Sequence, residues 1–256
     1  MTITEKQIQI WKDECIKWIK EWFNENGKDC CAVIGISGGK DSTVAAALCV
    51  EALGRDRVFG VLLPNGIQSD INDAERVCEF LQIKYTKLNL MYICEEIKSS
   101  IKRANNAGFV SINPTPQAEI NLPPRIRMSM LYYVSQCLNG RVVNTCNLSE
   151  DYVGYSTRWG DSVGDFSPLA NFTSEEVVAI GDLLGLPYDL THKTPSDGLC
   201  GKTDEDNLGF TYDILNKYIR TGICEDEDVK NKIDYLHNIN SFKMKPIPTF
   251  VPPILT

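Results

Sequence analysis

The stretch ISGGKDST, residues 36–43, places two glycines and several hydroxyl side chains in one short turn. Gly38 and Gly39 let the backbone approach a ligand closely, and Ser37 and Ser42 add hydrogen-bonding groups. The turn follows an apolar run and precedes an alanine-rich one, so a strand, a turn and a helix N-terminus follow in order. Backbone N–H groups at such a point attract anions. The pattern predicts a phosphate-binding turn, although the glycines alone would also suit an ordinary strand-to-helix connection.

The turn differs from a Walker A loop, which needs Gly, four residues, Gly, Lys and then Ser or Thr. Here Lys40 is followed by Asp41, and the residue five before Gly39 is Ile34. An aspartate at this place would repel a bare triphosphate. It could instead hold a magnesium ion that bridges phosphate oxygens, which suits a hard carboxylate ligand.

The elements around the turn alternate between strands and helices. The hydrophobic patterns predict strands over 30–36, 57–63, 83–90 and 141–146, and helices over 5–26, 42–53, 70–82, 91–106 and 125–140. The β-α-β-α-β order predicts an α/β fold with one parallel sheet and helices on both faces. Residues 110–124 carry four prolines without a period and predict a loop, and we expect mobile loops near 107–122 and 194–206. No linker divides residues 1–256, so one domain is expected.

Composition excludes several classes of function. The net charge of −8 and the pI near 4.9 argue against binding to a nucleic-acid backbone, which needs a positive surface. No apolar run is long enough for a membrane helix and no secretory signal is present, so we expect a cytoplasmic protein that binds no membrane. The ten cysteines include no CxxC pair, which gives a zinc or iron–sulfur site little support.

SGGKDS resembles the signature of the PP-loop, or N-type ATP pyrophosphatase, families, whose loop holds the pyrophosphate that leaves when ATP becomes AMP. In that signature the fourth position varies, so Lys40 could simply face solvent. Further stretches resemble, in order, the landmarks of ammonia-dependent NAD synthetases: LLPNGIQSDINDA at 62–74, RIRM at 125–128, NLSEDYVGYSTRWGD at 147–161, DFSPLANFT at 165–173 and KTPSDGL to NKYI at 193–219. The resemblance covers residues 36–219.

This resemblance implies a fold, a reaction and an assembly. The implied fold is a single Rossmann-like sheet of the adenine nucleotide alpha hydrolase-like type. Nicotinate adenine dinucleotide (deamido-NAD) and ATP would give a dinucleotide-adenylate and pyrophosphate, and ammonia would then give NAD and AMP. Ammonia rather than glutamine is expected as the direct nitrogen source, because 256 residues leave no room for an amidase domain. The family works as a homodimer with the dinucleotide across the subunit interface.

The resemblance also implies a set of site residues. For ATP it implies Ile36, Ser37, Gly38, Gly39, Lys40, Asp41, Ser42, Thr145 and Ser196; for deamido-NAD, Arg125, Arg127, Asp161 and Asp165. The magnesium ligands would be Asp41 and Glu150, and the catalytic residues Asp41, Asp161 and Lys193. Two simpler readings stay open: Glu150 could merely favour a helix N-terminus, and the two arginines could lie on a solvated helix start.

One position departs from the family pattern. Ser174 stands where these enzymes commonly have a phosphate-binding lysine, and among Lys40, Lys193, Lys202 and Arg158 we favour Lys193 as its replacement. Two rival functions remain: a tRNA-modifying PP-loop ligase, and a non-catalytic module that binds an adenine nucleotide. The acidic chain argues against the first. The two acidic residues expected at the magnesium site argue against the second.

Overall fold

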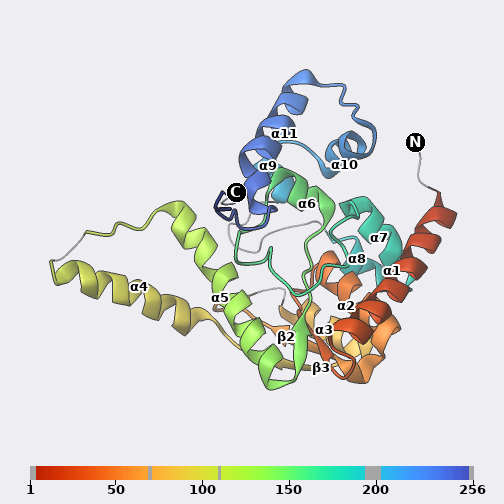
Figure 1. The fold of residues 1–256 in the computed structure, drawn as a ribbon, viewed down its shortest axis with the longest axis horizontal. Coiled ribbons are helices and arrows are strands. Elements are labelled where there is room, and N and C mark those ends of the chain that lie inside the picture. The colour runs from red at the N-terminus through yellow and green to blue at the C-terminus, as the bar shows by residue number, and fades with distance from the viewer. Residues whose placement is uncertain (1–3, 69–70, 109–110, 194–202, 254–256) are drawn as a thin grey trace.

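The computed structural model describes residues 4–68, 71–108, 111–193 and 203–253 (Figure 1). Its centre is a parallel sheet of four strands in the order β3-β2-β1-β4. The strands are β1 (Cys31–Gly35), β2 (Val58–Leu62), β3 (Lys84–Lys87) and β4 (Gly140–Val142). The predicted parallel α/β sheet is therefore confirmed.

Helices cover both faces of the sheet. They are α1 (Glu5–Asn26), α2 (Lys40–Leu53), α3 (Ile71–Leu81), α4 (Met91–Asn106), α5 (Pro116–Cys137), α6 (Leu148–Val153), α7 (Ser174–Leu183), α8 (Tyr188–Thr191), α9 (Asp204–Leu208), α10 (Tyr212–Thr221) and α11 (Glu227–Asn240), with short 3-10 turns at Arg55–Arg57 and Ser241–Lys243. α4 and the first half of α5 project away from the body (Figure 1).

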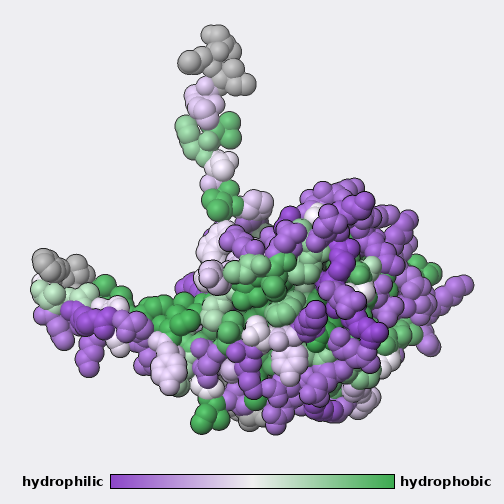
Figure 2. All heavy atoms as spheres, turned by 90° about the horizontal axis from the view of Figure 1, so that it is seen from below, coloured by the Kyte–Doolittle hydropathy of each residue, from purple (hydrophilic) through white to green (hydrophobic). Residues whose placement is uncertain are grey.

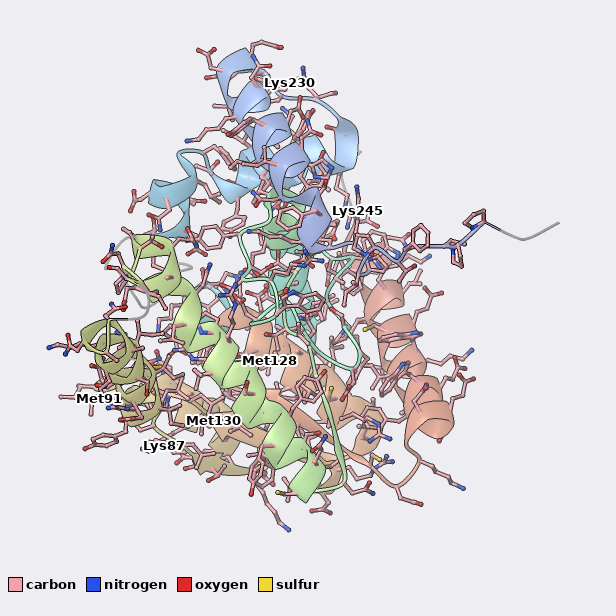
Figure 3. The ribbon with its side chains drawn as sticks, turned by 60° about the vertical axis from the view of Figure 1, so that its left-hand side comes forward. Lys87, Met91, Met128, Met130, Lys230 and Lys245 are labelled. Carbon is pink, nitrogen blue, oxygen red and sulfur yellow. The ribbon has the colours of Figure 1, made fainter. Side chains whose placement is uncertain are left out.

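Successive side chains of β1 point to opposite faces of the sheet and so enter two different hydrophobic cores. Ala32 and Ile34 join a core shared with α1, α2 and α7, whereas Val33 joins a second core on the opposite face. Met128 of α5 (Figure 3) belongs to that second core, and so does Leu131 of the same helix. A third apolar cluster joins α6, α10 and α11. A strand covered on both faces must be apolar throughout, which is why residues 30–36 show no polar alternation.

The predicted loop over 110–124 is wrong from Pro116 onwards, where α5 begins. Thr115 caps this helix, and Pro116 occupies its first turn, where a missing backbone N–H costs nothing. Pro123 and Pro124 lie inside the helix and are buried. Tertiary packing therefore overrides their helix-breaking tendency.

Two other boundaries differ from the prediction. The strand expected over 141–146 ends at Val142, because the next residue makes only an isolated bridge, to Phe166. The loop expected over 194–206 lies outside the described residues up to 202. From there Thr203 caps α9, and its side chain accepts a hydrogen bond from the backbone of Asp206.

An ion pair between a buried carboxylate and an arginine whose side chain is 33% exposed joins α7 to α10. The Nε of Arg220 donates to Oε1 of Glu176 at 2.7 Å, and Glu176 is only 3% exposed. We expect Arg220→Met to lower the free energy of unfolding by about 3 kcal/mol, because it leaves a buried carboxylate without its cation. Urea denaturation measures this loss. In the double variant with Glu176→Gln the loss should be smaller than the sum of the two single losses. A loss below about 1 kcal/mol for Arg220→Met would contradict the assignment.

Candidate active site

A cavity of about 1020 Å³ opens at the carboxyl ends of the strands. It lies where the sheet order reverses, since β1 has β2 on one side and β4 on the other. Ligands of parallel α/β sheets bind at this kind of position. Its walls come from the turn after β1, from α5, from the loop after β4, and from α9 and α11.

The turn after β1 is held by its own hydroxyl groups. The backbone N–H of Ser37 donates to the Oγ of Ser42 at 3.2 Å, and the Gly39 N–H donates to the Oγ of Ser37, also at 3.2 Å. The Thr43 hydroxyl donates to the Gly39 carbonyl at 2.7 Å. Of the predicted phosphate-binding stretch, the residues that line the cavity are Ile36, Ser37, Gly39, Lys40, Asp41 and Ser42.

Gly38 is not among the described lining residues, but its backbone conformation sets the shape of the turn. Its φ is +81°, and an added Cβ would lie 2.8 Å from the backbone nitrogen of Ala74. We expect Gly38→Ala to lower the free energy of unfolding by about 2 kcal/mol or more through strain and crowding against α3. The matched control is Gly39→Ala, since Gly39 has φ −88° and its Cβ would meet only the Oγ of Ser37, at 3.3 Å. Equal thermal stability of the two variants would refute this account.

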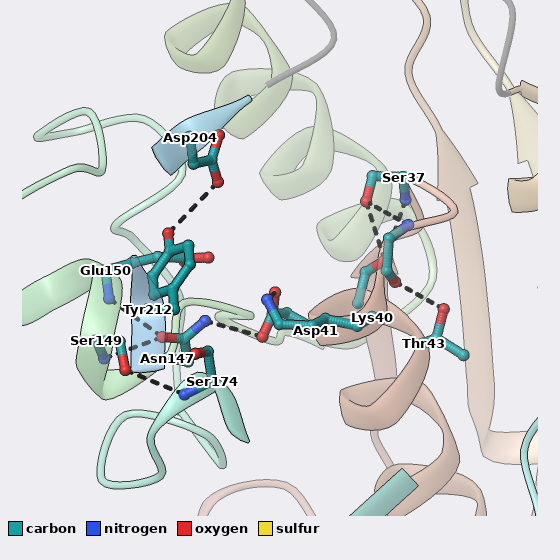
Figure 4. A network of polar contacts seen from close by, with 12 residues as sticks. Ser37, Lys40, Asp41, Thr43, Asn147, Ser149, Glu150, Ser174, Asp204 and Tyr212 are labelled. Carbon is teal, nitrogen blue, oxygen red and sulfur yellow. Dashed lines mark hydrogen bonds and ion pairs between the residues drawn. The ribbon is translucent and has the colours of Figure 1, made fainter. Parts of the chain in front are cut away.

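Asn147 joins the turn to a second acidic residue (Figure 4). Its Nδ2 donates to Oδ1 of Asp41 at 2.9 Å. Its Oδ1 accepts the backbone N–H groups of Ser149 and Glu150, at 3.0 and 3.1 Å, and so caps α6. Glu150 thus opens a helix, as the simpler reading proposed, and that same helix start brings it to the cavity.

The two acidic residues repel each other. Burial raises the pKa of Glu150 well above its ordinary value, and the negative charge of Asp41 raises it further. Two carboxylates whose negative charges repel each other suit a hard divalent cation such as Mg²⁺, because the cation would neutralise both. Within the described residues no three His, Cys, Asp or Glu side chains form a metal-binding group. An ion held by this pair would therefore complete its coordination with phosphate oxygens and water.

The alternative that Lys40 faces solvent is wrong. The residue is 6% exposed, and its Nζ lies 2.7 Å from Oδ2 of Asp41 and 5.8 Å from the ring centroid of Tyr212. Burial alone would lower the pKa of Lys40. The charges of Asp41 and Glu150 outweigh that effect and raise the pKa above its ordinary value. The start of α2 is covered by segments far along the chain, which the local sequence pattern does not reveal.

Sequence reasoning missed four residues around this point: Asn147, Tyr155, Asp204 and Tyr212. The hydroxyl of Tyr155 donates to Oδ1 of Asp204 at 3.1 Å, and that of Tyr212 donates to Oδ2 at 3.4 Å. The available signal was the pattern T-D-E-D at 203–206, which is typical of a helix N-terminus.

Arg125 and Arg127 line the cavity from the middle of α5. Neither arginine lies at a helix start, because the helix begins at Pro116, although Arg125 is exposed to solvent as the simpler reading expected. The Nε of Arg127 donates to the carbonyl of Leu63 at 3.1 Å, which ties α5 to the end of β2. Thr145 lines the opposite wall, in the loop after β4.

Asp161 and Asp165 are separated by the structure. The described lining residues include Asp161 but not Asp165. Oδ1 of Asp161 accepts the N–H of Thr157 at 2.6 Å, and burial of the carboxyl group raises its pKa. Oδ2 of Asp165 instead accepts the N–H of Val142 at 2.7 Å, at the end of β4. Asp165 therefore holds the sheet edge in this chain.

The cations considered as replacements at position 174 have different surroundings. Nζ of Lys193 lines the cavity and lies 2.7 Å from Oδ2 of Asp73. The guanidinium of Arg158 stacks near the rings of Trp159 and Phe242, at 4.8 and 5.1 Å from their centroids. Ser174 itself is buried, and its N–H donates to the Oγ of Ser149 at 3.0 Å. Lys202, the remaining cation considered, lies outside the described residues, as does Ser196, which was expected at the ATP site.

The fold and the glycine turn define the class, an α/β protein with a large cavity at the switch point of a parallel sheet. The sequence profile of the NAD synthase family matches residues 11–251, and the chain belongs to this family. It is 36% identical over 197 residues to an NH3-dependent NAD synthetase of Pyrococcus furiosus, an alignment that covers 77% of this chain and 73% of the relative.

Two solved structures resemble the fold closely. An NMN synthetase from Francisella tularensis aligns with a TM-score of 0.85 at 28% identity, covering 99% of this chain and 100% of that one. An NH3-dependent NAD synthetase from Campylobacter jejuni aligns with a TM-score of 0.76, also at 28% identity, covering 96% and 99%.

Proposed function

We propose that the chain is a ligase that amidates the nicotinate carboxylate of deamido-NAD with ammonia, at the expense of ATP, to give NAD, AMP and pyrophosphate. The observation that carries this proposal is that Asp41 of the glycine turn and Glu150 line one large cavity and are linked through Asn147, in a chain of the NAD synthase family. Transfer of AMP to the carboxylate would convert a poor leaving oxygen into a good one.

Each wall of the cavity has a place in this reaction. The backbone N–H groups and hydroxyls of residues 37–42 would bind the departing pyrophosphate, on which charge grows. Mg²⁺ held by Asp41 and Glu150 would neutralise part of that charge. The guanidinium groups of Arg125 and Arg127 would bind the dinucleotide phosphates. The carboxylate of Asp161 would attract ammonium and accept its proton.

The direct test is pyrophosphate release by the purified protein with ATP, Mg²⁺, an ammonium salt and deamido-NAD. NAD should form in step with pyrophosphate, and glutamine in place of ammonium should support a much lower rate. Pyrophosphate release that does not depend on the dinucleotide would reject the proposal.

A second candidate substrate is nicotinate mononucleotide. The observation that favours it is the full-length match to the NMN synthetase, whose TM-score exceeds that of the C. jejuni enzyme. Both substrates carry the same nicotinate carboxylate, so the same turn and acid pair would serve either reaction. The comparison of kcat/KM for the mononucleotide and the dinucleotide decides which one the cavity selects, and the larger value identifies the substrate.

A homodimer is also proposed, on the basis of exposed apolar side chains on the projecting helices. Hydrophobic residues gather beside the projection (Figure 2); the exposed ones on and between α4 and α5 are Met91, Tyr92, Ile93, Ile97, Ile112, Ile120 and Tyr133. Such a surface is typical of an interface between subunits. Light scattering at several protein concentrations would test it, and a monomer at all of them would refute it.

The expected setting is the cytoplasm, with small-molecule substrates and no nucleic acid. The net charge of −8 supports this, because a nucleic-acid backbone would be repelled. Across the described residues, every helix is too short or too polar to cross a membrane.

A further inference from the structure

Lys40 occupies a position that is unfavourable for a cation. It is the first residue of α2, after the N-cap Gly39, and the helix dipole disfavours positive charge there. It is also buried, at 6% exposure, so its ammonium group has lost most of its hydration. A buried charge in this place requires compensation by acidic groups.

That compensation comes from three separate segments. Asp41 on α2 contacts the ammonium group directly, at 2.7 Å. Glu150 at the start of α6 and Asp204 at the start of α9 line the same cavity as Lys40 and add further negative charge there. The ring of Tyr212 lies 5.8 Å from Nζ, within the range of a cation–π contact. Lys40 thus lies among acidic residues that come from distant parts of the chain (Figure 4).

We propose that Lys40 is a resident counter-ion at the acid pair: before a nucleotide binds, its ammonium group pairs with Asp41 beside Glu150, and a divalent cation must displace it to bind the two carboxylates. The inference rests on the metal site of the proposed function. The inference implies that free metal binds weakly, because the cation competes with a positive charge that is already in place.

Displacement would leave the ammonium group beside the phosphate turn. Ser37, Gly39 and Ser42 of the turn line the same cavity as Lys40, so the released charge would remain within reach of a bound anion. A lysine ammonium is a flexible point charge suited to phosphate oxygens.

The test measures Mn²⁺ binding to the nucleotide-free protein by electron paramagnetic resonance, with no substrate present. Lys40→Met should bind Mn²⁺ at least about tenfold more tightly than the wild type, because an opposing charge within a few ångströms is removed. Lys40→Arg keeps the charge and should bind like the wild type. Lys12→Met is the matched control, because Lys12 also pairs with the following aspartate, Asp13, at 3.0 Å, but is not among the described lining residues.

Equal or weaker Mn²⁺ binding by Lys40→Met would overturn the proposal, as would the absence of Mn²⁺ binding in every variant. A purely structural ion pair would lower the stability of Lys40→Met without tightening the binding of metal. Failure of the proposed amidation reaction is a separate outcome, because this assay contains neither ATP nor dinucleotide.

A second measurement needs no variant, in case Lys40→Met does not fold. Acylation of lysines in the wild type, followed by peptide mass spectrometry, reports how accessible each amine is. Addition of Mg²⁺ alone should increase the labelling of Lys40 several-fold and leave that of Lys12 unchanged. Unchanged labelling of Lys40 at metal concentrations that saturate the site would overturn the displacement.

Discussion

Asp41→Asn is expected to lower the rate of pyrophosphate release at least about tenfold, the scale of one lost charged contact in a transition state. The substitution removes one charge of the acid pair and takes from Lys40 its nearest partner, now 2.7 Å away. Turnover is measured with saturating ATP, ammonium and dinucleotide. Asp13→Asn, which also neutralises an aspartate that follows a lysine, is the control and should keep full activity.

The same assay shows whether the two carboxylates act as a unit. If both hold one cation, the double variant Asp41→Asn, Glu150→Gln should lose little more activity than the more damaging single variant. Strictly multiplicative losses would mean that the two residues act independently. Full activity of Asp41→Asn would remove it from the catalytic residues altogether.

The second large effect distinguishes Asp161 from Asp165. Asp161→Asn should lower kcat/KM for ammonium about a hundredfold, the lower range for a lost general base, because Asp161 lines the cavity. Asp165→Asn should leave kcat nearly unchanged and lower the melting temperature, since Asp165 accepts the N–H of Val142 at the edge of the sheet. Steady-state kinetics and thermal unfolding on both variants check this pair of outcomes. A large loss of kcat/KM in Asp165→Asn, together with a loss of stability alone in Asp161→Asn, would contradict this assignment of roles.

The raised pKa of Asp161 predicts how the ammonium-dependent rate changes with pH. Burial raises the pKa of its carboxyl group above the ordinary value of 3.8, so the proton is lost at a higher pH than usual. The ammonium-dependent rate should therefore fall on the acid side at a pH above that ordinary value, where the carboxylate becomes protonated and no longer accepts a proton. Asp161→Asn should abolish this acid limb, and its persistence in the variant would assign it to another group.

Much of the fold follows from local patterns. The helix predicted over 5–26 coincides with α1, and the strands form the expected parallel sheet, because apolar periodicity reports directly on which faces are buried. The start of α5 was missed for a physical reason. Proline ends a helix when it lies in the interior but favours one when it lies in the first turn, and Pro116 is of the second kind. Composition alone does not separate the two cases.

The part of the site that comes from one continuous stretch of sequence could be predicted. The glycine turn and Asp41 belong to one continuous stretch, and their spacing is informative. Asn147, by contrast, meets Asp41 across 106 positions of sequence. The orientation of Lys40 likewise depends on Asp204 and Tyr212, which approach it only after α9 and α10 have packed. Contacts of this kind are set by tertiary structure, so no short pattern could reveal them.

The two prolines inside α5 separate a short first segment, residues 116–122, from a longer second segment, residues 125–137. Neither Pro123 nor Pro124 has an N–H, so two successive hydrogen bonds of the helical ladder are missing there. The segment that follows them packs against the sheet, whereas Gln117, Ile120 and Asn121 of the segment before them line the mouth of the cavity. Fewer hydrogen bonds therefore join the segment before the prolines to the rest of the helix, and we expect that segment to open more readily than the segment after them. Amide hydrogen exchange would then be faster over residues 117–122 than over 125–137.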